Sequence, residues 1–144
     1  MSKGISRLFD GTIGSPQLTI GIGYQPDFGR DSVNKNRLYT VRVKNEYLHG
    51  PIWVYTPEGA LTAHFPVVYN DITVIDLNNR ANRMFSSYYK LNANGKPYKF
   101  NFEQEKADKE EMLSIIAALI SRLDKINDGT FVIDDCESQR LKDL

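Results

Sequence analysis

The chain has 144 residues, with 18 basic and 18 acidic side chains and therefore a formal net charge of zero. This length is typical of one domain that buries a core without a disulfide or a metal ion. Zero net charge disfavours a nucleic-acid-binding protein, because affinity for phosphate depends on an excess of basic residues. No apolar stretch approaches the roughly 18 residues of a membrane span, and none resembles a signal peptide. We therefore expect neither a nucleic-acid partner nor a membrane partner.

The single cysteine, Cys136, cannot close an intrachain disulfide. A lone thiol is typical of a reducing compartment, so we expect a cytoplasmic protein. The acidic residues beside Cys136 are predicted to raise the pKa of its thiol, which disfavours a role as nucleophile.

Charge is distributed unevenly along the chain. Residues 101–144 hold 11 acidic and 6 basic side chains, a net charge of −5, so residues 1–100 carry a net charge of +5. Such asymmetry influences the encounter with a charged partner. The alternative interpretation is a solvated acidic helix face.

The first 17 residues are predicted to form a weakly ordered lead, because three glycines and a proline interrupt any periodic pattern. Residues 18–144 are predicted to form one domain. Composition rich in Gly, Pro, Asp and Asn predicts a loop at residues 24–36. Alternating apolar and β-branched residues predict strands at 18–22, 38–43, 52–55, 61–65 and 72–75.

A shorter helix is predicted at residues 77–89, where Asp76 is suited to be the N-cap and apolar residues recur at helical spacing. The Asn-Gly pair at residues 94–95 predicts a turn. The aromatic alternation that follows it predicts a short strand near residues 98–102.

A long helix in the C-terminal third is the best-specified element of the sequence. It is predicted to begin after Asn101 or after Asp108, because each is followed three residues later by Gln or Glu, as in a capping box. Gly129 is suited to follow its end, before a strand at 131–133 and a frayed turn at 139–144. The apolar stripe of this helix comprises Met112, Ile116, Leu119, Ile120, Leu123 and Ile126.

The order of these elements predicts the fold class. Strands come first, followed by a helix, a short strand and the long helix. This order predicts an α+β fold, with a largely antiparallel sheet and the long helix and a shorter helix packed on it.

Two histidines, His49 and His64, are the candidates for acid–base catalysis. They lie near neighbouring predicted strands, so pairing of those strands would bring the two rings close together. A small metal-independent ribonuclease would use them with a cation such as Arg42 or Lys44 for the phosphate. The alternative is structural, since His49 precedes a Gly-Pro turn and His64 falls within a predicted strand.

No metal or cofactor motif is recognisable. Asp134, Asp135 and Glu137 form an acidic group, but they lack the spacing of a calcium loop. The glycines at residues 11–14 and 21–23 lack the further residues of phosphate-binding loops. We therefore predict no metal and no cofactor. The acidic group is interpreted as either a partner-facing edge or solvated surface.

Aromatic residues and lysines alternate between residues 88 and 102. One interpretation places the aromatic rings in the core and the lysines in water. A tyrosine-rich protein interface and a platform for single-stranded nucleic acid are the alternatives. The residues are Tyr88, Tyr89, Tyr98, Phe100 and Phe102, with Lys90, Lys96 and Lys99 among them.

Three segments carry a resemblance to a known group of proteins. They are Glu46-Tyr47-Leu48-His49-Gly50-Pro51-Ile52-Trp53-Val54, Ser87-Tyr88-Tyr89, and residues 116–135 with Arg122-Leu123-Asp124-Lys125-Ile126-Asn127-Asp128-Gly129-Thr130-Phe131-Val132-Ile133. With these segments the chain resembles the small cytosolic immunity proteins of bacterial contact-dependent growth inhibition and related polymorphic toxin systems. The resemblance implies a stoichiometric inhibitor, without enzymatic activity, that binds a cognate toxin domain, often a nuclease, inside the producing cell.

An acidic surface is the predicted binding site for such a toxin, because a nuclease presents positive charge to phosphate. Two alternatives remain: the ribonuclease described above, and a mobile-element accessory protein that binds host machinery. The sequence predicts no oligomeric state. The predicted partner-binding residues are Glu103, Glu105, Glu110, Glu111, Asp134, Asp135 and Glu137.

Overall fold

The structure is a computed structural model that describes residues 37–144. The chain divides after Arg37, and the unit Leu38–Leu144 is described by itself. The lead at 1–17, the strand at 18–22 and the loop at 24–36 that the sequence predicts lie outside the described residues. The described elements are β1 (Tyr39–Val43), β2 (Ile52–Tyr55), β3 (Leu61–Thr62), α2 (Pro66–Tyr69), α3 (Ile72–Ser86), β4 (Tyr89–Leu91), β5 (Pro97–Phe100), α4 (Phe102–Ala107), α5 (Lys109–Ile126), β6 (Phe131–Asp135) and α6 (Ser138–Lys142).

Four strands form a mixed sheet in the order β3-β2-β1-β6, and β4 and β5 form a separate hairpin. Strand β2 runs antiparallel to β1 and to β3, with Val41 opposite Val54. Strand β6 runs parallel to β1, with Val41 opposite Ile133. The predicted α+β fold class is confirmed, since most strand pairs are antiparallel and the helices are segregated from the strands.

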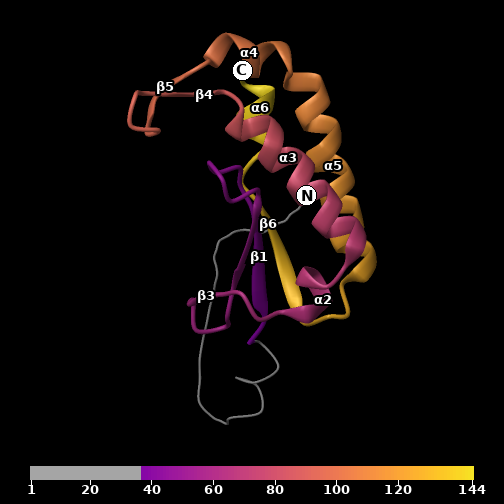
Figure 1. Cartoon of the computed structure of the whole chain (residues 1–144). Helices are drawn as coiled ribbons and strands as arrows, with labels where there is room; N and C mark the ends of the chain where they lie inside the picture. The colour runs from indigo at the N-terminus through magenta and orange to yellow at the C-terminus, as the bar shows by residue number, and fades with distance from the viewer. Residues whose placement is uncertain (1–36) are drawn as a thin grey trace. The chain divides into compact units, whose positions relative to one another are not determined.

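The helices α3 and α5 lie side by side along one face of the sheet (Figure 1). Alternation along β1 directs Val41 and Val43 toward this face, and both are fully buried. Ile116, Leu119 and Leu123 of α5 are buried in the same core cluster. Removal of this apolar surface from water is the main stabilising contribution to the fold.

Helix α3 replaces two predicted elements. Residues 72–75, predicted as a strand, form its first turn, and the predicted N-cap Asp76 lies inside the helix. Asp71 is the N-cap instead, because its carboxylate accepts a hydrogen bond from the Val74 amide at 3.0 Å. The helix ends at Ser86, so Tyr89 belongs to β4. This cap overrides the strand propensity of the β-branched run.

The structure uses both predicted starts of the long helix. Asn101 caps α4, where its side-chain oxygen accepts from the Gln104 amide at 3.0 Å. Asp108 lies between α4 and α5 but makes no side-chain cap, because its carboxylate accepts from the Tyr88 hydroxyl and from the Gln104 side chain. The sequence therefore predicts one helix where the chain forms two consecutive helices.

Several boundaries differ from the predictions for local reasons. The predicted strand 61–65 ends at Thr62, because Pro66 begins α2. The predicted strand 131–133 extends through Asp135, paired along its length with β1. The prediction of a frayed turn at 139–144 is wrong, because residues 138–142 form helix α6, in which Leu141 is fully buried.

Candidate functional site

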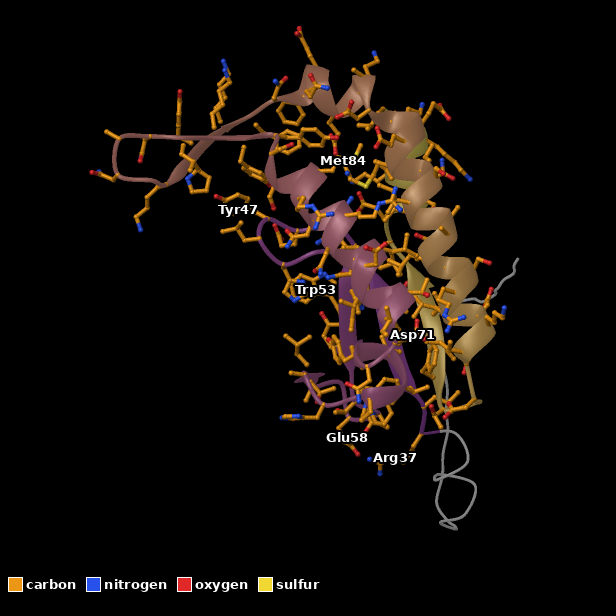
Figure 2. The ribbon with its side chains drawn as sticks, turned by 45° about the vertical axis from the view of Figure 1, so that its right-hand side comes forward. Arg37, Tyr47, Trp53, Glu58, Asp71 and Met84 are labelled. Carbon is orange, nitrogen blue, oxygen red and sulfur yellow. The ribbon has the colours of Figure 1, made fainter. Side chains whose placement is uncertain are left out.

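The seven acidic residues predicted to bind a partner lie in different environments. Glu103 on α4 and Glu110 and Glu111 on α5 are exposed. Glu111 shares an open groove of about 320 Å³ with Arg80 and Arg83 of α3, so this face carries both signs of charge. Met84 lines the same groove and is labelled on α3 in Figure 2.

Glu105 and Glu137, by contrast, are enclosed within the fold, with 3% and 1% of their surfaces exposed. Arg140 joins them: one terminal nitrogen donates to Glu105 at 2.6 Å and also to Glu137, and its Nε donates to Glu137 at 3.0 Å. Asn45 donates its backbone and side-chain N–H groups to the same Glu137 carboxylate. These carboxylates thus hold α4, α6 and the end of β1 together, away from the face that the sequence predicts for them.

Asp134 and Asp135 also have partners within the chain. Asp134 accepts a hydrogen bond from Arg42 Nε at 2.9 Å, and the Arg42 guanidinium lies over the Tyr55 ring. Asp135 Oδ1 accepts from the backbone amides of Glu137 and Ser138 at 3.0 Å each, which defines the start of α6. Of the predicted acidic residues, Glu103, Glu110, Glu111 and Asp135 are exposed and have no ion pair among residues 37–144, and the Asp135 carboxylate is already engaged by two backbone amides.

The two histidines have different surroundings. His49 is exposed and stacks on Trp53, with ring centroids 3.6 Å apart, and its Nδ1 lies 2.9 Å from the Gly50 carbonyl oxygen. His64 is exposed in the connection between β3 and α2, outside the strand predicted for it. A cavity of about 200 Å³ includes His49 in its lining but not His64. The cavity is lined by His49, Ile52, Tyr69, Val74, Ile75, Asn78 and Asn79.

Aromatic rings connect the core to the surface at the base of the β4–β5 hairpin. Phe85 of α3 contacts Tyr89 of β4, and Tyr89 contacts Phe100 of β5 at 4.9 Å between centroids. Phe102 extends the series from Phe100 at 4.8 Å, and Tyr47 packs on Tyr89 at 4.6 Å. Figure 2 shows Tyr47 near the base of the hairpin. Burial and the nearby carboxylates of Glu46 and Glu105 raise the pKa of Tyr89.

The hairpin projects away from helices α3 and α5 (Figure 1), and every residue from Lys90 to Lys99 is exposed. Large apolar side chains cluster on it and at its base. We call the following residues the hairpin surface: Tyr47, Leu48 (69% exposed), Leu91 (52%), Tyr98 (64%) and Phe102 (70%). Exposed aromatic and aliphatic side chains gathered in this way are typical of protein interaction sites.

The aromatic residues between positions 88 and 102 are divided between the core and the surface. Tyr88 is buried, and its hydroxyl donates to Asp108 at 2.8 Å. Desolvation is the largest cause that raises the pKa of Tyr88, and the hydrogen bond to the Asp108 carboxylate raises it further. Phe100 is half-buried, whereas Tyr98 and Phe102 point to solvent. Tyr47 and Leu48 were missed, although their position in the loop before β2, between two strong strand patterns, was the available signal.

Three further features bear on chemistry. Desolvation and the carboxylate of Asp134 raise the pKa of the Cys136 thiol to about 11, in the predicted direction. Within residues 37–144, no group of three or more His, Cys, Asp and Glu side chains is placed to hold a metal ion. No helix in this part of the chain is both long and apolar enough to cross a membrane.

Comparison with known proteins gives no match to a family model, to a curated protein or to a solved structure.

Proposed function

We propose that this chain is an immunity protein that neutralises a cognate toxin domain by stoichiometric binding. The observation that carries the proposal is the hairpin surface. More than half of the surface is exposed for Leu91 and Tyr98, on the hairpin arm that projects from the core, and for Phe102, at the base of this arm in α4. Exposed apolar side chains of this size have unfavourable hydration, which burial against a protein partner relieves.

Tertiary packing prepares this surface for binding. The ring contacts from Phe85 through Tyr89 and Phe100 to Phe102 fix the base of the hairpin against α3. A surface held in this way loses little conformational freedom when a partner binds, so more of the interaction energy appears as affinity. This is the behaviour expected of a tight inhibitor.

The exposed acidic residues support the choice of a nuclease toxin as the partner. Glu103 follows Phe102 directly, and Glu110 and Glu111 lie in the first turn of the next helix. A nuclease must present basic side chains to phosphate, so an acidic region beside an apolar contact accelerates association with it. The resemblance to immunity proteins supplies the class of partner.

The experiment is calorimetry between this protein and the C-terminal domain encoded immediately upstream of its gene, combined with a toxicity assay in cells. We expect one-to-one binding with a Kd at or below about 1 nM, typical of tight protein inhibitors, and loss of toxicity. The double variant Leu91→Ser/Phe102→Ser should weaken binding by at least about tenfold, because both side chains are truncated at an apolar contact.

His64→Ala is a matched control, because His64 is exposed and lies in the connection after β3. An inhibitor tolerates this change, whereas the ribonuclease alternative requires the histidine. Absence of binding by the wild-type protein would overturn the proposed function. Normal binding by the Leu91→Ser/Phe102→Ser variant would be consistent with inhibition but would show that the hairpin surface is not the binding site.

A further inference from the structure

The β4–β5 hairpin is well defined at its tip. Asn92 Oδ1 accepts hydrogen bonds from the backbone amides of Asn94 at 2.9 Å and Lys96 at 3.0 Å, and the Asn92 amide donates to the Lys96 carbonyl oxygen at 2.8 Å. Gly95 adopts φ +76°, the left-handed conformation that glycine favours. The tip is therefore closed by its own hydrogen bonds.

Two lysines face each other across this hairpin. Lys90 of β4 lies directly opposite Lys99 of β5, and Lys96 is a third exposed cation beside the turn. Like charges at directly opposite positions of an antiparallel pair are destabilising. No ion pair within the described part of the chain involves any of the three lysines. The positive charges of Lys90 and Lys99 therefore destabilise the hairpin, and no acidic side chain of the described residues compensates them.

We infer that the β4–β5 hairpin binds carboxylate-bearing side chains on a protein partner, with Lys90 and Lys99 as the contacting cations. The inference rests on the proposed function in taking the partner to be a protein. Leu91 and Tyr98 adjoin these lysines in the sequence of the two strands and are also exposed, so a partner that binds the arm can reach apolar side chains as well. Carboxylates placed between Lys90 and Lys99 neutralise the repulsion between them, so binding and hairpin stability increase together.

An acidic protein fits this hairpin better than single-stranded nucleic acid does. Nucleic-acid platforms combine stacking rings with a basic groove that follows the phosphate backbone. Here Tyr98 and Phe102 expose rings that can stack, but the exposed Leu91 is aliphatic and Glu103 directly follows Phe102 at the base of the arm. A carboxylate at that point repels phosphate and attracts basic side chains. The surface is therefore complementary to a protein that presents carboxylates to the arm and cations to α4.

The test uses the full chain and two probes, a peptide of alternating Glu and Leu residues and poly(U) RNA. NMR spectra are recorded as each probe is added. We expect the peptide to shift the amide resonances of β4 and β5, and to bind more tightly than poly(U) at the same salt concentration. The absence of peptide-induced shifts in the hairpin, or tighter binding of poly(U), would overturn the inference.

The variant Lys90→Glu/Lys99→Glu reverses the sign of the arm but keeps like charges opposite each other, so hairpin stability stays comparable. It should bind the peptide at least about tenfold more weakly. The control Lys44→Glu/Lys125→Glu makes the same change of charge at exposed positions outside the hairpin and should bind normally. Equal losses in both variants would show a general charge effect and overturn the inference.

The same two variants separate this inference from the proposed function. If the wild-type chain neutralises the toxin domain and the Lys90→Glu/Lys99→Glu variant does so equally well, the inference fails while the function stands. If the wild-type chain does not bind the toxin domain, the function fails, and the peptide titration still decides the chemistry of the arm.

Discussion

Two charged regions of this protein differ in whether their charged side chains have partners of opposite charge. Around Arg140, two carboxylates with 3% and 1% exposure share one guanidinium, and Asn45 adds two N–H donors. On the β4–β5 hairpin, Lys90 faces Lys99, and neither lysine has a carboxylate partner within the described residues. The buried charges have a cation and hydrogen-bond donors as partners, whereas the exposed lysines have no carboxylate partner within the described residues.

Desolvation explains this difference. A carboxylate taken out of water loses several kcal/mol of hydration, so it persists inside a protein when cations and hydrogen-bond donors surround it. An exposed lysine keeps its hydration, so a missing partner costs it little. Buried charges therefore contribute to the stability of the fold, whereas unpaired exposed charges are available to bind a partner.

The largest expected effect comes from breaking the buried cluster. Arg140→Ala leaves Glu105 and Glu137 enclosed without their cation, and we expect the free energy of unfolding to fall by about 3 kcal/mol. This is the lower end of the usual range, because the Arg140 side chain is 41% exposed and water can partly replace it. Urea denaturation measures the change.

Two further variants test the cause of that loss. Arg140→Lys keeps the charge but has a single nitrogen for two carboxylates, so we expect an intermediate loss. Arg80→Ala removes an exposed arginine from α3 and should change stability by less than about 0.5 kcal/mol. Equal effects of Arg140→Ala and Arg80→Ala would show that the cluster is not a folding determinant.

A smaller effect is expected at Asp71, a partly buried charge that has a cation partner. Its carboxylate caps α3 and accepts two hydrogen bonds from Arg122, at 2.7 and 3.0 Å. Asp71→Ala should cost about 1 kcal/mol through loss of the cap alone. Asp71→Asn keeps a capping oxygen and should cost less. Thermal denaturation of both variants measures the difference.

Stability at this site should also depend on pH. The Arg122 hydrogen bond holds the pKa of Asp71 below its ordinary value of 3.8. A lowered folded-state pKa stabilises the protein above the ordinary value, and this contribution is lost as pH falls through the folded-state pKa. The stability difference between wild type and Asp71→Asn should therefore shrink below about pH 4. A difference that stays constant down to pH 2 would contradict the assignment.

The smallest expected effect has the opposite sign. Lys99→Glu places a carboxylate opposite Lys90 and should stabilise the hairpin by about 0.2 to 1 kcal/mol. Hydrogen exchange of the β4 and β5 amides measures this gain as slower exchange. Binding of the Glu-Leu peptide should weaken in the same variant. A variant that gains stability while losing binding shows that the lysine pair serves recognition, and a loss of both would point to simple disruption of the arm.

Local patterns predicted much of the scaffold. Alternating Val41 and Val43 predicted β1 to within one residue, and the β-branched and aromatic run of β2 gave its bounds. The two capping patterns, at Asn101 and Asp108, mark the starts of α4 and α5, although they were predicted as alternative starts of a single helix. The strand predicted at residues 72–75 is wrong, because a β-branched run has the same local pattern whether it starts a helix or forms a strand. The cap at Asp71 and its contact with Arg122, 51 residues away, decide between them.

The candidate surface was harder to predict than the scaffold. Spacing placed Glu105 and Glu137 on an acidic face, but their burial depends on Arg140, which is 35 residues from Glu105. The three-residue spacing of Glu137 and Arg140 was the one local signal of a pair. Leu91 and Tyr98 could be identified as exposed surface residues only from the structure, in which the pairing of β4 with β5 places them on the projecting hairpin.

The sequence by itself determined the α+β class, the central strands and the long amphipathic segment, because periodicity and capping act within a few residues. The tertiary structure alone decided which charges are buried, which aromatic rings pack on the core, and that β6 pairs in parallel with β1. These outcomes depend on contacts between residues far apart in the chain, and their energies come from desolvation, which local sequence does not encode.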